Sequence, residues 1–279
     1  MSGELLGVEF WGTRGSFPVP GKDKTRYGTN TSCVSICAGG NYFVFDAGTG
    51  LYDFGKQCVE KSQVFEASIF FSHFHMDHVE GLPFFKLSFA NNAKVDLYAK
   101  NLYGVGVTGN ALRDLFKRPY FPVEFLAGES QTEFSFTSIE DSKVYKFPNN
   151  VTLEAILVKH TEDICLSYKL QYNNKKVVYM TDIELSKGLK EEEHIIEFVR
   201  DADMLILDAY FTEENFIEGW GHSTWERNIE LANMASVKQL VMFHHNIESS
   251  DWDLDILYER FKYSTKKLTV ARDGLKVMI

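Results

Sequence analysis

Cysteine is scarce in this sequence of 279 residues, and the four that occur do not have the spacing of a zinc ribbon. Cys33 and Cys37 lie in an apolar, strand-like run, which favours buried, reduced side chains. Residues 1–4 lack the basic and apolar segments of a signal peptide. No apolar run is long enough to span a bilayer. These absences predict a cytoplasmic protein without a membrane segment.

Positive charge is also in short supply. Lys and Arg number 29 against 39 Asp and Glu, which gives a formal net charge of −10. Proteins that bind long nucleic acids usually carry a basic face, because neutralising phosphates supplies much of their affinity. We therefore expect no long nucleic acid as the ligand. A small anionic substrate remains compatible, since bound metal ions reverse the local field.

No Pro/Gly/Ser-rich linker divides the chain, and no low-complexity tract occurs. Hydrophobic residues make up 44% of the sequence and include 23 Phe and 13 Tyr, so a single large core can be filled. The sequence therefore predicts one domain over residues 1–279. An insert-like region around residues 83–148 is harder to assign.

The order of the predicted elements indicates a layered α/β fold, in which the early strands without helices form a partly antiparallel sheet. Short aromatic or β-branched runs predict strands over residues 6–11, 33–38, 42–45, 67–71, 95–98, 151–158, 165–172, 176–180, 204–207 and 239–243. Helices are predicted over residues 50–62, 78–89, 105–117, 190–202, 224–236 and 251–263. Asn173 and Asn174 predict a hairpin turn, and Ser223 or Thr224 is the expected cap of the helix that follows.

Polar side chains follow several predicted strands directly. They are Asp46, His73, Asp182 and His244. Strand ends converge on one edge of a layered fold, and active sites of α/β proteins are built at such edges. We therefore expect these side chains to meet.

The densest polar cluster is residues 72–78, with the sequence SHFHMDH. In an extended segment, residues two apart point to the same side, so His73 and His75 can bind one metal ion together. Asp77 and His78 follow where the chain turns, and they can face a second ion. Imidazole and carboxylate ligands suit zinc, and also manganese or iron. A surface cluster of polar residues is the alternative, which the preceding apolar strand disfavours.

This segment resembles the His-x-His-x-Asp-His signature of the metallo-β-lactamase superfamily, and the family's other motifs follow in order. Residues 46–50, DAGTG, resemble the first motif, whose Asp orients the metal-binding histidines. The later motifs are matched by His160, Asp182 and His244, and His245 competes for the last position. The resemblance implies an α/β (α+β) fold, the αββα sandwich, that holds two divalent metal ions, with zinc expected and manganese or iron as options.

The resemblance also implies how the ligands are shared. One ion would be held by His73, His75 and His160, the other by Asp77, His78 and His244, and Asp182 would bridge them. A hydroxide between two ions about 3.5–4 Å apart is a nucleophile at neutral pH. Asp77 is then expected to take part in catalysis as well as in metal binding.

A second set of motifs resembles the phosphodiesterase branch of the superfamily, which includes phosphoribosyl cyclic phosphodiesterases and ribonuclease Z. The set comprises residues 11–16 (WGTRGS), 27–33 (YGTNTSC) and 221–224 (GHST). In that branch the last histidine lies beside the scissile phosphate. The resemblance thus implies that His222 is a general acid or a charge partner. Residues 208–212 (DAYFT) also resemble an element of this branch, which implies a supporting role for Asp208 in the site. A polar helix-capping turn is the alternative.

The sequence departs from this branch after two of the expected ligands. Residues 161–163 (TED) replace a Pro-Gly-Gly-like turn, and residues 246–250 (NIESS) stand where relatives often carry Asp and a further His. The chain also lacks the long Gly/Pro-rich arm with which ribonuclease Z holds tRNA. These departures leave the metal set intact and argue against tRNA processing.

We therefore expect a di-metal hydrolase that cleaves a small or cyclic phosphodiester, such as a nucleotide. A homodimer is an option by analogy alone. The alternatives are a hydrolase of esters, thioesters or lactams, a di-iron redox or oxygen-binding protein, and a non-catalytic sensor. Redox relatives usually have Glu where this chain has His75, which favours hydrolysis.

Two further features have open interpretations. Arg14 and Arg26 could contact a phosphate, or they could form surface salt bridges. The stiff loop 119–122 (PYFP) could cover the site or stack on a base. A dimer contact or core packing is the alternative for this loop.

Overall fold

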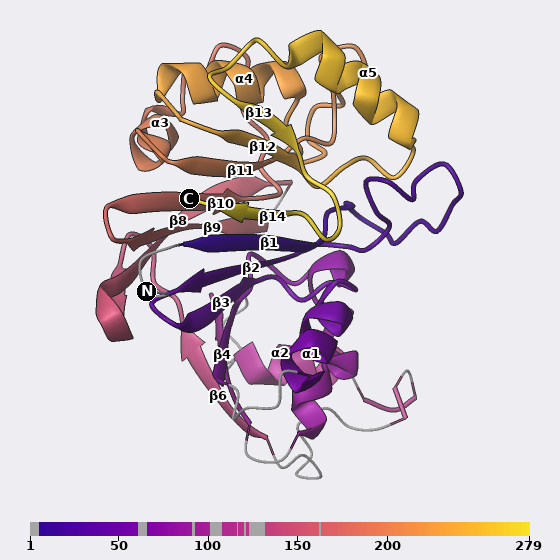
Figure 1. Cartoon of the computed structure of the whole chain (residues 1–279), viewed down its shortest axis with the longest axis vertical. Coiled ribbons are helices and arrows are strands. Elements are labelled where there is room, and N and C mark those ends of the chain that lie inside the picture. The colour runs from indigo at the N-terminus through magenta and orange to yellow at the C-terminus, as the bar shows by residue number, and fades with distance from the viewer. Residues whose placement is uncertain are drawn as a thin grey trace.

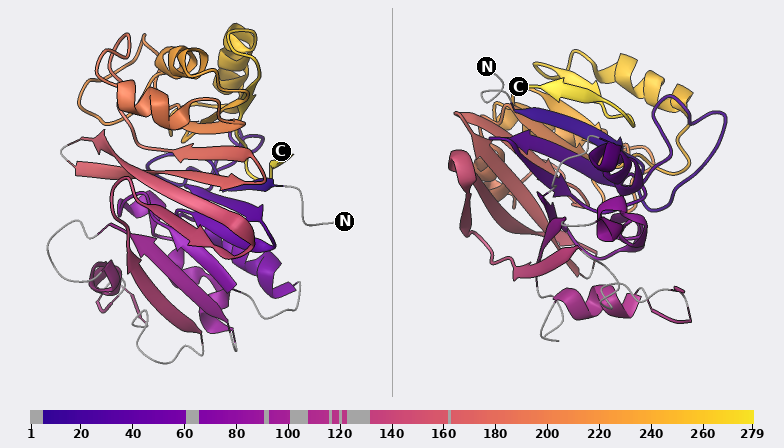
Figure 2. Two further views of the ribbon diagram at one scale, coloured as in Figure 1. Left: turned by 90° about the vertical axis from the view of Figure 1, so that its left-hand side faces the viewer. Right: turned by 60° about the horizontal axis from the view of Figure 1, so that its bottom comes forward.

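The computed structural model describes residues 6–60, 66–90, 93–100, 108–115, 117–119, 121–122, 132–161 and 163–279. They form two seven-stranded sheets packed face to face, with helices on both outer sides (Figure 1, Figure 2). This arrangement confirms the predicted αββα sandwich.

The first sheet changes from antiparallel to parallel along its width, as the sequence predicted. Its order is β14 (Lys276–Met278), β1 (Gly7–Gly12), β2 (Cys33–Ala38), β3 (Asn41–Phe45), β4 (Glu66–Phe70), β5 (Lys94–Ala99) and β6 (Glu133–Ser138). Pairing is antiparallel from β14 to β3 and parallel from β3 to β6. Gly39 and Gly40, both with positive φ, make the tight turn between β2 and β3.

The second sheet has the order β13 (Leu268–Val270), β12 (Leu240–Phe243), β11 (Met204–Asp208), β10 (Lys175–Met180), β9 (Asp163–Tyr172), β8 (Val151–His160) and β7 (Val144–Phe147). The strands from β10 to β13 pair in parallel, and those from β7 to β10 are antiparallel. Asn173 and Asn174 have φ of 48° and 61°, which confirms the predicted hairpin turn between β9 and β10.

The helices form the two outer layers (Figure 1). Outside the first sheet lie α1 (Leu51–Glu60) and α2 (Thr108–Leu115), and outside the second lie α3 (Glu193–Val199), α4 (Trp225–Met234) and α5 (Asp251–Phe261). The Thr224 side chain accepts a hydrogen bond from the Arg227 backbone N–H and so caps α4, as expected. No described helix has both the length and the apolar character needed to cross a bilayer.

Side chains along the central strands alternate between the two faces of a sheet, so one strand contributes to two hydrophobic cores. In β10, Val177 and Tyr179 belong to the core between the sheets, whereas Val178 and Met180 belong to the core under the outer helices. The middle core is rich in aromatic rings. The ring centroid of Phe43 in the first sheet, for example, lies 6.1 Å from that of Phe70, and Phe43 makes an edge contact at 5.1 Å with Phe147 of the second sheet.

The predicted helix over residues 78–89 is wrong. Three short 3₁₀ helices take its place: Met76–His78, Leu82–Phe84 and Lys86–Phe89. Pro83 removes a backbone donor that an α-helix needs. Gly81 is pressed against the loop after β3, where a Cβ would lie 2.0 Å from the Gly48 carbonyl oxygen. The close packing of Gly81 against that loop therefore prevents a regular α-helix here.

The other predicted elements are present, and β2 has the predicted ends. Among the predicted helices that are present and fully described, the largest shortening is at residues 190–202, where α3 covers only Glu193–Val199. The short strands β6, β7, β13 and β14 were not predicted. The region around residues 83–148 supplies β5 and β6 to the first sheet and β7 to the second. None of the four cysteines is in a disulfide, and three of them are buried, while Cys37 is half-buried.

Replacing Phe43 by Ala should lower the free energy of unfolding by about 3–5 kcal/mol, because the ring is buried between the two sheets. Urea unfolding measures the change as a shift of the midpoint at constant slope. Tyr263→Ala is the control, since that ring is 89% exposed and its loss should change the free energy by less than about 0.5 kcal/mol. Equal effects of the two variants would contradict the described packing.

Candidate metal centre

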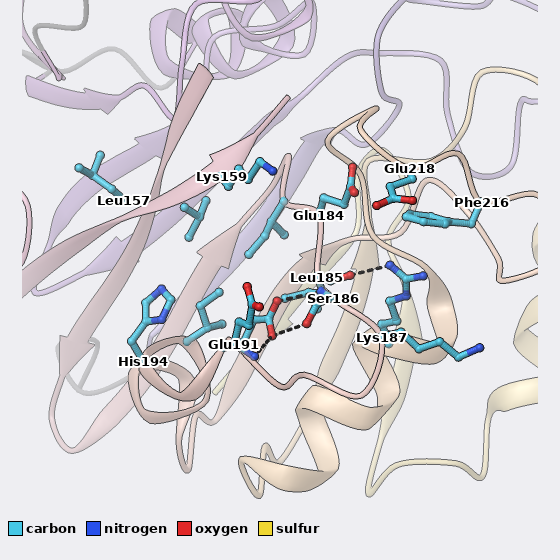
Figure 3. A pocket seen from close by; sticks show the side chains of 15 residues that line it. Leu157, Lys159, Glu184, Leu185, Ser186, Lys187, Glu191, His194, Phe216 and Glu218 are labelled. Carbon is cyan, nitrogen blue, oxygen red and sulfur yellow. Dashed lines mark hydrogen bonds between the residues drawn. The ribbon is translucent and has the colours of Figure 1, made fainter. Parts of the chain in front are cut away.

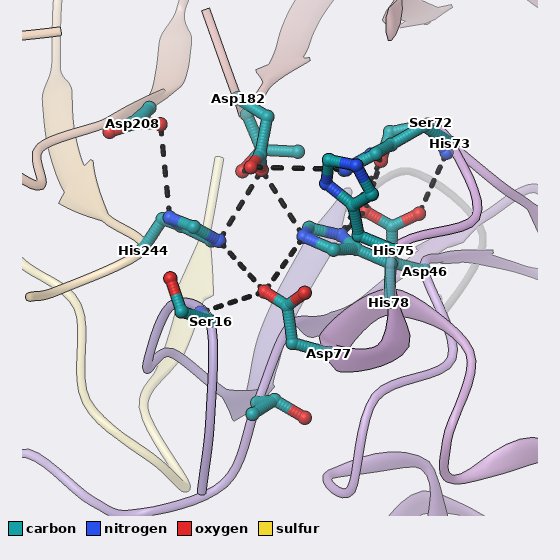
Figure 4. A network of polar contacts seen from close by, with 12 residues as sticks. Ser16, Asp46, Ser72, His73, His75, Asp77, His78, Asp182, Asp208 and His244 are labelled. Carbon is teal, nitrogen blue, oxygen red and sulfur yellow. Dashed lines mark hydrogen bonds and ion pairs between the residues drawn. The ribbon is translucent and has the colours of Figure 1, made fainter. Parts of the chain in front are cut away.

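The polar side chains that follow the strands meet at one edge of the sandwich (Figure 4). The elements that end there are β3, β4, β8, β10, β11 and β12. Asp46, Asp182 and His244 each adopt a left-handed backbone one or two residues after a strand, with φ of 60°, 52° and 55°. Such conformations are costly for residues other than glycine and cluster at functional sites. Here they turn each side chain from the end of its strand into the cluster.

One group of imidazoles comprises His73, His75 and His160. One ligand nitrogen of each lies within 4.8 Å of the others. His160 Nε2 is 3.2 Å from His75 Nδ1. His73 Nε2 is buried, and none of the described residues forms a hydrogen bond with it. Three nitrogens that converge in this way can hold a metal ion.

A second group comprises Asp77, His78 and His244. Asp77 Oδ2 is 3.0 Å from His78 Nε2 and 3.1 Å from His244 Nε2. The backbone N–H of Ser16 donates to the same oxygen at 2.8 Å, which fixes the carboxylate. The three ligand atoms are again close enough to share one ion.

Asp182 lies between the two groups. Its Oδ2 is 3.2 Å from His78 Nε2 and 3.4 Å from His244 Nε2. Its Oδ1 is 3.6 Å from His160 Nε2 and 3.9 Å from His73 Nε2. Oδ2 thus faces the second group and Oδ1 faces the first group, as a bridging carboxylate requires.

Outer contacts hold two of the histidines with Nε2 directed inward. His78 Nδ1 donates to Asp46 at 2.8 Å, and the same carboxylate accepts from the Tyr179 hydroxyl at 2.7 Å. His160 Nδ1 lies 2.8 Å from the Gly221 carbonyl oxygen. Because a carbonyl only accepts, Nδ1 of His160 carries the proton and Nε2 keeps its lone pair. Contacts of this kind set the tautomer of metal-binding histidines.

The charges of the cluster fit divalent cations. Burial opposes the ionised form of Asp182, but His244 and His78 outweigh it and hold its pKa well below the usual range. Burial, reinforced by His78, lowers the pKa of His73 far below its usual value. Neutral imidazole and ionised carboxylate are the forms that bind metals. In the described part of the chain, no Lys or Arg forms an ion pair with Asp77 or Asp182, and their ion-pair partners are imidazoles. A divalent cation would take the place of the imidazole protons as the positive charge.

His222 stands beside the cluster. Its Nδ1 is 2.6 Å from Asp208 Oδ2 and 3.8 Å from Asp182 Oδ1. The ring stacks on Tyr210, with centroids 4.5 Å apart and an interplanar angle of 16°. Burial lowers the pKa of His222, but Asp208 dominates and raises it to about 9. The structure therefore places an imidazole whose charged form is favoured by Asp208 beside Asp182 of the cluster.

His245 points away from the cluster. Its Nε2 donates to the Ala271 carbonyl oxygen at 2.8 Å. Burial, together with the charge of Arg14, lowers its pKa to about 3, so the ring is neutral. Of the two neighbouring histidines, only His244 is in position to bind a metal.

Neither expected role of Arg14 is seen. Its side chain is fully buried and donates to the carbonyl oxygens of Gly28, Asn246 and Ser249 at 2.8–3.3 Å. It neither reaches the cluster nor forms a surface salt bridge, because the loop after His245 folds over it. Arg26, in contrast, pairs with Asp255 at 2.5 Å on the surface, which confirms the salt-bridge alternative.

Three contacts of the site were not expected from the sequence. They are made by the Ser16 N–H, the Gly221 carbonyl and the Tyr179 hydroxyl. Two motif glycines do have a structural reason. A Cβ on Gly15 would lie 2.5 Å from His244 Nδ1, and one on Gly221 would lie 2.3 Å from His160 Nδ1. Tyr120 of the loop 119–122 and Glu162 of the altered turn lie outside the described residues.

The fold and the cluster together define a metal-dependent hydrolase. The family model of the beta-lactamase superfamily domain matches residues 41–245, and the chain belongs to this superfamily. That span contains all seven side chains of the two groups and the bridge.

Relatives match over most of the chain. Ribonuclease Z of Picrophilus torridus is 25% identical, with 88% of each chain covered. Ribonuclease Z of Methanosarcina acetivorans is 27% identical over 99% of this chain and 98% of its own. Among solved structures, the metallo-beta-lactamase fold protein YhfI from Bacillus subtilis has a TM-score of 0.72 at 16% identity, covering 99% of this chain and 100% of that one. A diphosphatase from the PhnP family has a TM-score of 0.69 at 20% identity, covering 98% and 97%. The structural likenesses show the shared fold.

His244→Ala should reduce the bound metal by about one ion per chain, because the second group loses one of its three ligands. His245→Ala is the matched control and should keep the wild-type metal content. It should still lower stability by about 1–3 kcal/mol, since the buried Ala271 carbonyl loses its donor. Metal analysis of the purified variants distinguishes them. Metal loss in the His245 variant alone would reverse the assignment.

Proposed function

We propose that this chain is a phosphodiesterase with two divalent metal ions. The proposed ligands are His73, His75 and His160 for one ion, Asp77, His78 and His244 for the other, and Asp182 between them. Zinc is the proposed metal, because most of these donors are imidazole nitrogens. The observation that carries the proposal is the position of His222, whose ring is held by Asp208 beside Asp182 of the cluster.

The proposed ions would neutralise the charge of a phosphodiester and supply Lewis acidity. The chain's own contribution is orientation and a proton. Asp46 and Gly221 hold His78 and His160 with Nε2 inward. Since Nδ1 of His222 is engaged by Asp208, its Nε2 proton is the one available for the leaving oxygen. The same charge would stabilise negative charge that develops on phosphorus oxygens.

A small or cyclic phosphodiester is the proposed substrate. The net charge of −10 disfavours a long polyanion. Arg14, the basic residue of the N-terminal motif, uses its donors on backbone carbonyls and is not available to a phosphate.

RNA is a second candidate substrate, and a specific observation favours it. The relatives with 25–27% identity over most of the chain are named ribonuclease Z. The short form of human tRNase Z also shares the fold, with a TM-score of 0.67 over 97% of this chain and 98% of its own. These relatives weigh against the expectation that long nucleic acids are excluded.

His222→Ala should lower kcat for a cyclic nucleotide by about 10²–10⁴-fold, because the leaving alkoxide loses its proton donor. Metal content should not change, since His222 is not a proposed ligand. His194→Ala is the matched control, because His194 is exposed on α3 outside the cluster. No turnover by the wild type with any divalent metal would end the phosphodiesterase proposal.

The two candidate substrates are separated by a direct comparison. The metal-loaded protein should hydrolyse cyclic or dinucleotide diesters with a higher kcat/KM than a tRNA precursor. Preference for the precursor, with cleavage at its 3′ end, would establish the RNA candidate instead.

A further inference from the structure

Glu184 follows the bridging Asp182 by two residues and lines a cavity of about 620 Å³ beside α3 (Figure 3). It forms no ion pair with any residue that the structure describes. Its carboxylate instead accepts hydrogen bonds from two backbone amides. Gly219 N lies 3.1 Å from Oε1 and 2.9 Å from Oε2, and Gly221 N lies 2.9 Å from Oε2. One side chain therefore holds the turn that contains both glycines.

This turn has little freedom where it passes the metal centre. Gly219 and Gly221 both have left-handed backbones, with φ of 81° and 77°. A Cβ on Gly221 would lie 2.3 Å from His160 Nδ1 and 2.8 Å from the Thr161 backbone nitrogen. Because the backbone approaches the histidine so closely, a small displacement of the turn would move the ring or break its hydrogen bond.

Gly221 connects Glu184 to two functional side chains. Its carbonyl accepts the proton of His160 Nδ1 at 2.8 Å, and so leaves Nε2 for a metal. The next residue along the chain is His222, whose Nδ1 is engaged by Asp208. The position of one peptide unit thus decides the orientation of a proposed ligand and of the proposed proton donor.

We propose that Glu184 is a positioning residue that acts through Gly221 on both His160 and His222. A side-chain oxygen suits this task, because Oε2 of Glu184 lies 2.9 Å from both the Gly219 and the Gly221 nitrogen. The assignment rests on the proposed function only in the roles it gives to these two histidines. Glu184 itself contacts neither His160 nor His222 in the described structure.

The test compares Glu184→Ala, Glu184→Gln and the control Glu218→Ala. Glu218 lines the same cavity and is exposed. Zinc affinity is measured by competition with a chelating dye, and the visible spectrum of the cobalt-substituted protein reports ligand geometry. The alanine variant should bind the zinc ion held by His160 10–100-fold less tightly and show an altered cobalt spectrum. Its kcat should fall more than its KM changes.

Gln keeps an oxygen that both amides can reach, so Glu184→Gln should recover zinc affinity to within about threefold of the wild type. Glu218→Ala should match the wild type in affinity and spectrum. Wild-type affinity and spectrum in Glu184→Ala would overturn the proposal, as would an equal loss in the glutamine variant. If Glu184→Ala does not fold, Glu184→Asp replaces it, since the shorter side chain cannot span both amides, and the same losses are expected.

The metal measurements require no substrate. A wild-type protein that hydrolyses no phosphodiester would therefore refute the proposed function while leaving the role of Glu184 to be decided by zinc affinity and the cobalt spectrum. Conversely, an active wild type with an unaffected Glu184→Ala variant would refute this inference alone.

Discussion

The burial of carboxylates at the ends of the strands is the constraint on which the site depends. Asp182 is almost inaccessible, and five imidazoles lie within 3.2–3.9 Å of its oxygens. Removing ions from water costs several kcal/mol each unless opposite charge replaces the solvent. Asp77 is buried in the same way, and no described Lys or Arg pairs with either of them. The cluster is therefore built for cations, and the hydrogen bonds around it hold its donors in place.

The sandwich supplies the rigidity that such a cluster requires. Left-handed backbones at Asp46, Asp182 and His244 each cost of the order of 1–3 kcal/mol, and they persist only where surrounding packing leaves no alternative. Each follows a strand whose side chains alternate between two cores. The aromatic core between the sheets thus fixes the strand ends, and the strand ends fix the ligands.

The sequence predicted the site best where several candidate ligands lie close together in the chain. Residues 72–78 carry their ligand spacing in one segment, and alternation marked the central strands. His160 has no such neighbours, and only the resemblance identified it. The helix expected over residues 78–89 failed because tertiary packing at Gly81 and a missing donor at Pro83 outweighed the apolar pattern. The edge strands β13 and β14 are three residues each, too short for a pattern to establish.

Arg14 and Glu184 show a different limit of sequence reasoning. Both are charged residues whose partners are backbone groups from distant loops. A backbone carbonyl or amide is present at every position, so a pattern of residue types cannot reveal which one a side chain will meet. The sequence suggested a phosphate or surface role for Arg14 and no role for Glu184.

Both proposed ions take donors from the two sheets at once. His73 and His75 follow a strand of the first sheet, and His160 ends a strand of the second. Asp77 and His78 likewise face His244, which follows a strand of the other sheet. Occupied sites would therefore cross-link the N-terminal and C-terminal halves of the chain at the open edge of the sandwich. Metal supply would then govern how firmly the halves are joined as well as whether the enzyme can act.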